Sequence, residues 1–478
     1  MTSPTDASTT GGVHVYRAHV FHIAGAPDQT RVAEHLVSFP DGGLVVDGEG
    51  RIVWLGPWHS LPAAYAAAPV TRADYLIPGF VDAHVHFPQS YATAAHGGGQ
   101  LLEWLDHCIF PTEARFADLE FAGRAARYFT RRRIAAGTTA AMVFGSAFPV
   151  AQDALYRETL DAGLRVVSGR GIQTVGPDAA SALLTTEEDA VTLVADEIDR
   201  WHAVDTGDPR TAHVQVAVVP RFSLSVTPRT LHALGELYDE ARMTGVYFHS
   251  HLNENNRKGD GEIAAVLGSY GVEAYLDTYD GRFLPGSKSG GHSLLGRRSS
   301  LAHAVHSQPR ELARMAETGT SIAHCPTSQL FLGSGTMPWR STVAAGVNIA
   351  LGSDIGAGDE WLISRVAGDC YKVHISEEGE AGTALHPAEL LFAATLAGAR
   401  ALDMEHAFGN LDVGKDADFL LIETSRWEPL EGMLSMGIRS DDEEQATLEE
   451  LFTLLVGLRQ PAIAGVYVAG RRAVAPPL

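Results

Sequence analysis

Two histidines, His84 and His86, stand two positions apart just after an apolar run bounded by proline and glycine, in the stretch Pro78-Gly79-Phe80-Val81-Asp82-Ala83-His84-Val85-His86. If this run is a β-strand, residues at alternate positions face the same side, so both imidazoles point the same way. Two neutral imidazoles fixed in this manner can share one metal ion. The spacing alone also fits two ordinary loop histidines, so the interpretation depends on the rest of the chain.

Further residues of the kinds that bind metals follow other apolar runs, namely His249, His251, Glu254, His303 and Asp354. Imidazoles and carboxylates without a thiolate suit zinc or iron, and three or four protein ligands leave a position open for water. Each residue also has an ordinary explanation, because a single histidine such as His303 often lies in a core and Ser353-Asp354 could cap a helix. Groups of this kind at the ends of four predicted strands are difficult to explain by coincidence, and we therefore predict a metal centre.

The elements that must position these residues are eight apolar segments of strand length, which alternate with amphipathic segments. The predicted strands are Leu76–Val81, Thr139–Phe144, Leu164–Ser168, Val214–Val219, Val246–Ser250, Ser300–Ala304, Ser321–His324 and Val347–Gly352. Helical patterns between them include Leu119–Ala136, Glu187–Val204, Arg229–Thr244 and Pro309–Thr318. This alternation predicts an α/β fold, a (β/α)8 TIM-type barrel, in which the carboxyl ends of the strands form the active face.

The two ends of the chain have a different pattern. Residues 13–75 and 406–478 contain short alternating segments separated by turn signals. We expect them to form a small discontinuous β-sandwich domain around a barrel at 76–405, with residues 1–12 disordered. A helix is predicted over Pro387–Leu402, a mobile Gly/Ser-rich insertion over Phe283–His292, and a solvated acidic face within 427–450.

Composition restricts the classes of partner. The formal net charge of −22 argues against nucleic acid and anionic membranes, which both require a basic surface. No apolar run reaches the roughly 18 residues of a membrane span, and nothing at the start of the chain resembles a signal peptide. Cys108, Cys325 and Cys370 are odd in number and widely spaced, which suits a reducing compartment such as the cytoplasm. A small, weakly charged substrate is expected.

The stretch Pro78–His86 resembles the first metal motif of the amidohydrolase superfamily, and Leu351-Gly352-Ser353-Asp354 resembles its last. Three more stretches resemble the guanine deaminases within that superfamily. They are His86-Phe87-Pro88-Gln89, then Leu101-Leu102-Glu103-Trp104-Leu105 with Phe110-Pro111-Thr112-Glu113, and Val219-Pro220-Arg221-Phe222-Ser223-Leu224-Ser225. The similarity covers most of Val13–Glu423.

The resemblance implies roles for individual residues. It implies one zinc per chain, with iron as the other possibility, bound by His84, His86, His251 and Asp354. It implies Glu254 as proton shuttle, His303 beside the attacking water, and Asp354 as a participant in the reaction. The substrate would contact Gln89, Arg221, Phe222, His251 and Glu254.

Two other features have no ligand role in this resemblance. His249 matches no ligand and is expected to be structural. His324-Cys325 could form a metal pair, but we expect a loop that shapes the pocket.

The implied reaction is the hydrolysis of guanine to xanthine and ammonia, by an enzyme expected to be a homodimer. Departures from the resembled pattern at Asn253 and at Gly356-Ala357-Gly358 concern the pocket. A deaminase of 8-oxoguanine, a pterin or an aminotriazine therefore remains an alternative. A non-catalytic scaffold is a further alternative, although all four predicted ligands and Glu254 are present. The cytidine type of zinc deaminase is excluded, because its His-x-Glu and Pro-Cys-x-x-Cys motifs are absent from the sequence.

Overall fold

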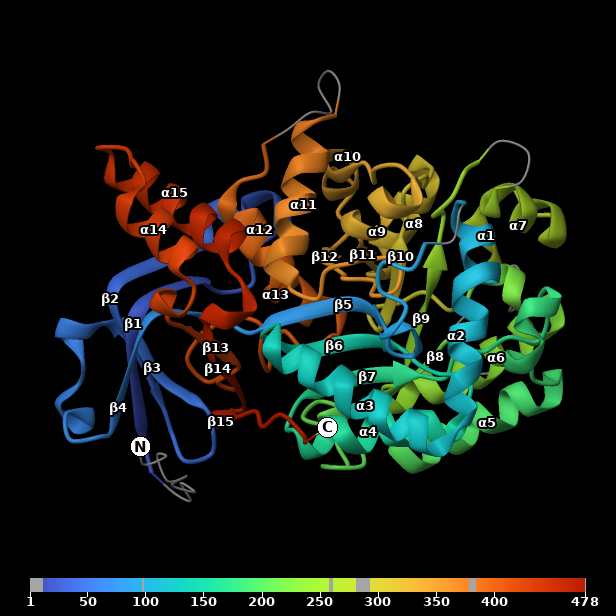
Figure 1. The fold of residues 1–478 in the computed structure, drawn as a ribbon, viewed down its shortest axis with the longest axis horizontal. Helices are drawn as coiled ribbons and strands as arrows, with labels where there is room; N and C mark the ends of the chain where they lie inside the picture. Colours follow the sequence, from blue (N-terminus) through green and yellow to red (C-terminus); the bar gives the residue numbers. More distant parts are fainter. Residues whose placement is uncertain (1–11, 97–98, 258–260, 281–292, 378–383, 478) are drawn as a thin grey trace.

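The centre of the molecule is a barrel of eight parallel strands (Figure 1). The computed structural model describes residues 12–96, 99–257, 261–280, 293–377 and 384–477. The barrel strands follow one another in chain order: β5 (Phe80–His86), β6 (Thr138–Phe144), β7 (Arg165–Gly169), β8 (Val214–Val218), β9 (Tyr247–Leu252), β10 (Ser299–His303), β11 (Ser321–His324) and β12 (Ile349–Leu351). The last strand returns to the first, where the Asp354 N–H donates to the His84 carbonyl over 2.8 Å. The predicted fold class is confirmed.

Helices cover the outside of the barrel and begin at recognisable caps. The side chains of Asp118, Thr186 and Thr227 accept hydrogen bonds from the first turns of α3, α5 and α6, as oxygen-bearing N-cap residues commonly do. The principal barrel helices are α3 (Leu119–Ala135), α4 (Pro149–Asp161), α5 (Glu187–Trp201), α6 (Pro228–Ala241), α7 (Glu262–Tyr270), α8 (Pro309–Thr318), α10 (Trp339–Ala344) and α11 (Ile363–Ile375). Three more helices, α1 (Leu101–Trp104), α2 (Phe110–Ala114) and α9 (Pro326–Leu332), lie near the carboxyl ends of the strands.

The predicted helix Pro387–Leu402 is wrong in one respect, because it breaks at Thr395. It becomes α12 (Pro387–Ala394) and α13 (Leu396–Ala401). Thr395 leaves the helical conformation, with φ −135° and ψ −87°, while its hydroxyl donates to the Leu391 carbonyl over 2.6 Å. A side-chain bond of this kind competes with the helical backbone pattern.

A second, mixed sheet is built from both ends of the chain. Its strand order is β15-β14-β13-β4-β1-β2-β3. The strands are β1 (His14–Ile23), β2 (Leu36–Val46), β3 (Ile52–Pro57), β4 (Val70–Pro78), β13 (Phe419–Ile422), β14 (Ile463–Val468) and β15 (Arg471–Arg472). The small β unit from both ends is therefore present as one seven-stranded sheet, and the exact domain limits at 75/76 and 405/406 stay predictions.

The predicted strand Leu76–Val81 is in fact the end of one strand and the start of another. β4 ends at Pro78 in the small sheet, and β5 begins at Phe80 in the barrel. The Gly79 N–H donates to the carbonyl of Asp418, next to β13, whereas the Phe80 N–H donates to the carbonyl of Gly137, next to β6. A Cβ on Gly79 would lie 2.3 Å from Thr139 Cγ2, so only glycine fits where the chain passes between the two sheets.

The two sheets share one hydrophobic core. Its largest cluster contains Phe80 and Phe129 from the barrel side together with Ile77 and Leu420 from the small sheet. Helices α14 (Glu428–Met436) and α15 (Glu443–Gly457) also contribute, since Leu430 and several leucines of α15 are buried there.

Three sequence predictions concern segments outside this core. The acidic run Asp441–Glu444 is exposed, as predicted. The predicted insertion Phe283–His292 and residues 1–11 of the N-terminus lie outside the described residues. Among the described residues, no helix is long and apolar enough to cross a membrane.

Candidate metal centre and substrate pocket

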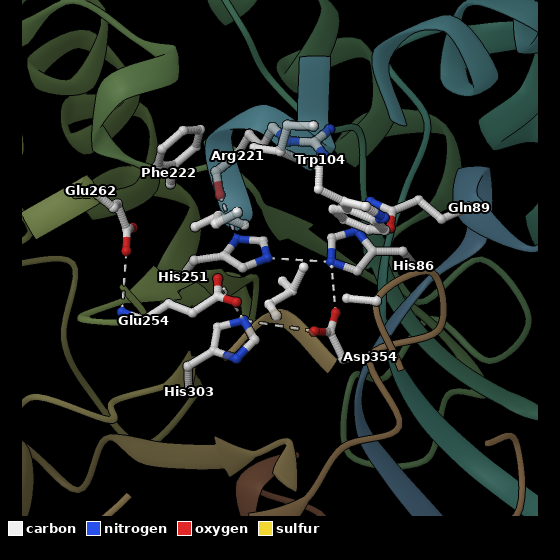
Figure 2. A pocket seen from close by; sticks show the side chains of 14 residues that line it. His86, Gln89, Trp104, Arg221, Phe222, His251, Glu254, Glu262, His303 and Asp354 are labelled. Carbon is white, nitrogen blue, oxygen red and sulfur yellow. Dashed lines mark hydrogen bonds and ion pairs between the residues drawn. The ribbon is translucent and has the colours of Figure 1, made fainter. Parts of the chain in front are cut away.

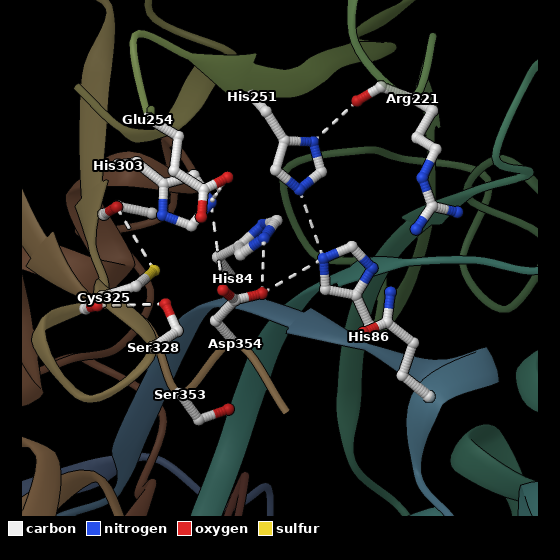
Figure 3. Close-up of polar contacts among 12 residues, drawn as sticks. His84, His86, Arg221, His251, Glu254, His303, Cys325, Ser328, Ser353 and Asp354 are labelled. Carbon is white, nitrogen blue, oxygen red and sulfur yellow. Dashed lines mark hydrogen bonds and ion pairs between the residues drawn. The ribbon is translucent and has the colours of Figure 1, made fainter. Parts of the chain in front are cut away.

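The four residues predicted to bind a metal converge at the carboxyl ends of the barrel strands (Figure 3). His84 and His86 belong to β5, His251 to β9, and Asp354 follows β12. Asp354 Oδ1 lies 3.2 Å from His84 Nε2 and 3.1 Å from His86 Nε2. His251 Nε2 lies 3.2 Å from His86 Nε2. Ligands bound tetrahedrally at 2.0–2.1 Å are about 3.3 Å apart, so this spacing fits a zinc-sized ion.

Hydrogen bonds behind the rings leave the Nε2 atoms free to bind a cation. His249 Nδ1 lies 2.8 Å from the Ser300 carbonyl and must donate to it, so His249 Nε2 accepts from His84 Nδ1 over 2.7 Å. His84 Nε2, which is buried, then carries a lone pair that faces another acceptor, Asp354 Oδ1, 3.2 Å away. His251 Nδ1 donates to the Arg221 carbonyl over 2.6 Å in the same way. Outer hydrogen bonds of this type orient metal-binding histidines, which gives His249 a structural role.

Burial keeps the imidazoles of His86 and His251 neutral, as metal ligands must be. It lowers the pKa of His86 to about 4, and burial together with neighbouring imidazoles lowers the pKa of His251 well below its ordinary value. Burial acts in the opposite direction on Asp354, but its contacts with His84, His86 and His303 hold the pKa of this carboxyl well below its usual range. The donor set is therefore three imidazoles and one carboxylate.

Glu254 and His303 lie beside this centre and extend it. His303 Nε2 is 3.3 Å from Glu254 Oε2 and 3.9 Å from Asp354 Oδ2. A ring nitrogen of His303 also lies within 4.8 Å of the potential ligand atoms of His84, His251 and Asp354. Burial and the charges of Asp354 and Glu262 raise the pKa of Glu254 well above its ordinary value. This places a carboxyl with a high affinity for protons next to the position where a cation and its water would be.

The backbone at these strand ends is strained. His303 has φ +75° and Asp354 has φ +48°, and Asn253, beside Glu254, has φ +50°. Positive φ is uncommon for residues other than glycine, and such strain concentrates at functional sites. Three turns of this kind around one centre indicate that the fold forces these side chains inward.

A pocket of about 390 Å3, including the open space at its entrance, lies over the candidate metal centre (Figure 2). This volume is at the small end of the roughly 300–1,000 Å3 typical of ligand pockets. Two predicted substrate residues, Gln89 and Arg221, lie together on one side of it. Glu113 of α2 joins them, because its Oε1 accepts from Gln89 Nε2 over 3.0 Å and its Oε2 accepts from Arg221 Nη1 over 2.6 Å. Buried polar groups thus form one fixed edge of the pocket.

Apolar side chains provide the other walls of the pocket. They include the predicted Phe222, and also Leu101, Trp104, Leu105, Leu332 and Ala357. Sequence reasoning did not assign Trp104 or Glu113 to the site, although both stand in the stretches that carried the family resemblance. It also missed Glu262, which lines the pocket and accepts from the Glu254 N–H over 3.1 Å. No spacing pattern signalled Glu262, because it begins a separate helix.

The departures from the family pattern have local explanations. Asn253 turns its amide toward Glu311, with both carboxylate oxygens 3.1 Å away. Gly356, at φ +127°, lies so close to Gln89 that a Cβ would be 1.9 Å from its Oε1.

Neither His324 nor Cys325 is among the pocket-lining residues. Both are buried at the start of the segment leading into α9, whose last residue, Leu332, does line the pocket.

Comparisons with known proteins agree with this geometry. Residues 75–473 match the amidohydrolase family. The chain is 38% identical to a probable guanine deaminase of Deinococcus radiodurans, over 93% of this chain and 95% of that one. It is 32% identical to the guanine deaminase of Escherichia coli strain K12, over 91% of each chain. The solved structure of an E. coli guanine deaminase superposes with a TM-score of 0.81 at 29% identity, covering 97% of this chain and 99% of the other.

Proposed function

The chain belongs to the amidohydrolase family of metal-dependent enzymes, and we propose that it is a hydrolytic deaminase that converts guanine and water to xanthine and ammonia. One observation carries this assignment. Arg221 and Gln89, held by Glu113, form one polar edge of a small pocket that the candidate metal ligands His86, His251 and Asp354 also line. A planar ring with hydrogen-bonding groups on one edge and a reactive carbon on the other fits this arrangement.

We assign His84, His86, His251 and Asp354 as the ligands of one zinc ion, with iron as the alternative. The 3.1–3.2 Å separations among their ligand atoms support this set, as does the buried lone pair of His84 Nε2, which faces the acceptor Asp354 Oδ1. When bound, such an ion lowers the pKa of a water molecule to about 7 and so supplies hydroxide near neutral pH. His303 is placed as a neighbour of the water because its Nε2 is farther from Asp354, at 3.9 Å.

The polar edge orients the ring. Arg221 is 3% exposed, and its guanidinium lies over Phe110 at 5.3 Å, so it points in a fixed direction. It donates to the oxygen on C6 of guanine, and Gln89 meets another polar position of the ring. Phe222 and Trp104 enclose the ring faces. This orientation turns C2 and its amino group toward the metal centre.

Glu254 moves the protons. Its carboxyl takes a proton from the attacking water and delivers it to ring nitrogen N3 as the new C2–O bond forms. The C2–N bond then breaks as Glu254 passes the remaining proton of that oxygen to the amino group, which leaves as ammonia while the oxygen becomes the C2 carbonyl. His303 and Asp354 orient the attacking water and stabilise the tetrahedral intermediate, since preorganised groups around a reacting centre contribute strongly to catalysis.

The test measures metal content and ammonia release with the same preparation. We expect about one zinc or iron per chain at this centre. We also expect release of ammonia from guanine, which is monitored by the absorbance change as xanthine forms. Adenine should be inert, because it presents an amino donor where Arg221 requires an acceptor. If metal-loaded protein does not deaminate guanine but deaminates 8-oxoguanine, a pterin or an aminotriazine, the assignment of guanine as the substrate is refuted. Loss of metal without loss of activity would refute the ligand set.

The proposed enzyme acts in the cytoplasm as a homodimer. The absence of disulfides among Cys108, Cys325 and Cys370 supports a reducing compartment, whereas the dimer follows from the family resemblance alone. Light scattering coupled to gel filtration measures the oligomeric state, and a monomer at micromolar concentration would contradict the proposed dimer.

A further inference from the structure

A second cluster of metal-binding side chains lies behind the active centre, where helix α11 packs against the end of β11. His324 is the last residue of β11, and Cys370 and His374 belong to α11. Residues four positions apart lie on the same face of a helix, so the thiol and the imidazole both face His324. The ligand atoms of the three residues lie within 4.8 Å of one another, and all three residues are fully buried.

The hydrogen bonds of His374 prepare it for a cation. Its Nδ1 lies 2.8 Å from Glu377 Oε1 and donates to this carboxylate. Its Nε2 therefore carries a lone pair, and it lies 3.2 Å from Nε2 of His324. A carboxylate behind the ring is the usual support of a metal-binding histidine. The separation of the two Nε2 atoms is close to the roughly 3.3 Å between tetrahedral ligands of zinc.

A hydrogen bond from His324 Nε2 to His374 Nε2 would also explain the separation of the two imidazoles. His324 Nδ1 is buried and has no hydrogen-bond partner among the described residues, so it stays unsatisfied in either arrangement and does not distinguish them. What distinguishes the cation is the third ligand atom, because a cation shared by both Nε2 atoms also recruits the thiol of Cys370.

We propose that His324, Cys370 and His374 form a second zinc site, which fastens α11 to β11. Two imidazoles and one thiolate match the preference of zinc for nitrogen and sulfur ligands. Burial lowers the pKa of His374 to about 4 and that of His324 well below its ordinary value, so both rings are neutral. Burial also raises the pKa of the Cys370 thiol, and zinc binding should therefore release a proton from it.

The experiment uses the whole chain, stripped of metal by a chelator and reloaded with zinc or, for spectroscopy, with cobalt(II). We expect two zinc ions per chain, one for each cluster. We also expect the near-ultraviolet charge-transfer absorption of a cobalt–thiolate bond, which the active centre cannot give because its ligands are imidazoles and a carboxylate. Cys370→Ser and His374→Gln should each lose one zinc and this absorption, while Cys325→Ser, a buried thiol outside the cluster, keeps both.

Binding of the remaining zinc and an unchanged circular dichroism spectrum show that a variant is folded. If Cys370→Ser does not fold, His374→Gln decides the question, since glutamine fills a similar space. A wild-type chain that binds one zinc and shows no thiolate absorption overturns the proposal. A second zinc that persists in a folded variant also overturns it, because that ion must then be bound elsewhere.

Discussion

Glu113 accepts hydrogen bonds from both Gln89 and Arg221, and its replacement by glutamine tests whether this pair positions the substrate. A glutamine has one acceptor and one donor end, so it cannot accept from both partners. The Arg221 contact is a 2.6 Å bond between buried charged groups. Hydrogen bonds to charged groups contribute about 1.5–3 kcal/mol, so we expect kcat/KM for guanine to fall about 10- to 150-fold.

The assay compares guanine with 2-aminopurine, which is guanine without the oxygen on C6. Only guanine can use the Arg221 contact, so Glu113→Gln should reduce the preference for guanine over 2-aminopurine and act more on KM than on kcat. Zinc content should stay unchanged. Glu197→Gln is the matched control, because Glu197 is equally buried but bonds to Tyr156 and Arg170 away from the pocket. Equal losses with both substrates would refute the reasoning and make Glu113 a purely structural residue.

Three further outcomes are expected. Glu254→Gln should keep its zinc but lose about 10²- to 10⁴-fold in kcat, because an amide cannot carry the proton; near-normal turnover would move the shuttle role to another residue. His249→Phe removes the acceptor that orients His84, so zinc affinity measured by chelator competition should fall about 10- to 100-fold, and an unchanged affinity would contradict the assigned tautomer. Burial raises the pKa of Glu197 to about 7 from 4.5, so the folded state holds a proton that the unfolded state releases between these values. The wild type should therefore lose up to about 3 kcal/mol of stability as pH rises from 4.5 to above 7. Urea midpoints should show Glu197→Gln to be less pH-dependent, and parallel curves would contradict this.

Much of the centre could be predicted from the sequence because its ligands stand at the ends of apolar strands. The spacing of His84 and His86 places both rings on one side of β5, and Asp354 follows a strand in the same way. Their convergence was therefore predictable, although their catalytic roles stay predictions. Glu113 could not be placed by such reasoning, because it meets Arg221 across 108 positions of the chain. Only the tertiary structure brings these two residues together.

The errors in the predicted elements have similar causes. The apolar run from Leu76 to Val81 continues across Gly79 without a polar residue, so hydrophobicity alone gives no sign that the chain changes sheets there. The break at Thr395 is hidden for a similar reason, since the residues on both sides of it are small or apolar and suit a continuous helix.

The order of synthesis matters for the small sheet. One side of β4 pairs with β1, and its other side pairs only with β13, where Leu76 faces Leu421 and Ile77 faces Leu420. β13 lies about 340 positions later in the chain, which takes the ribosome roughly 17–70 s at about 5–20 residues per second. An apolar edge without a neighbour invites pairing with other chains. On the ribosome the nascent N-terminal sheet therefore has to stay shielded, by a chaperone or by the growing barrel, until the last strands emerge.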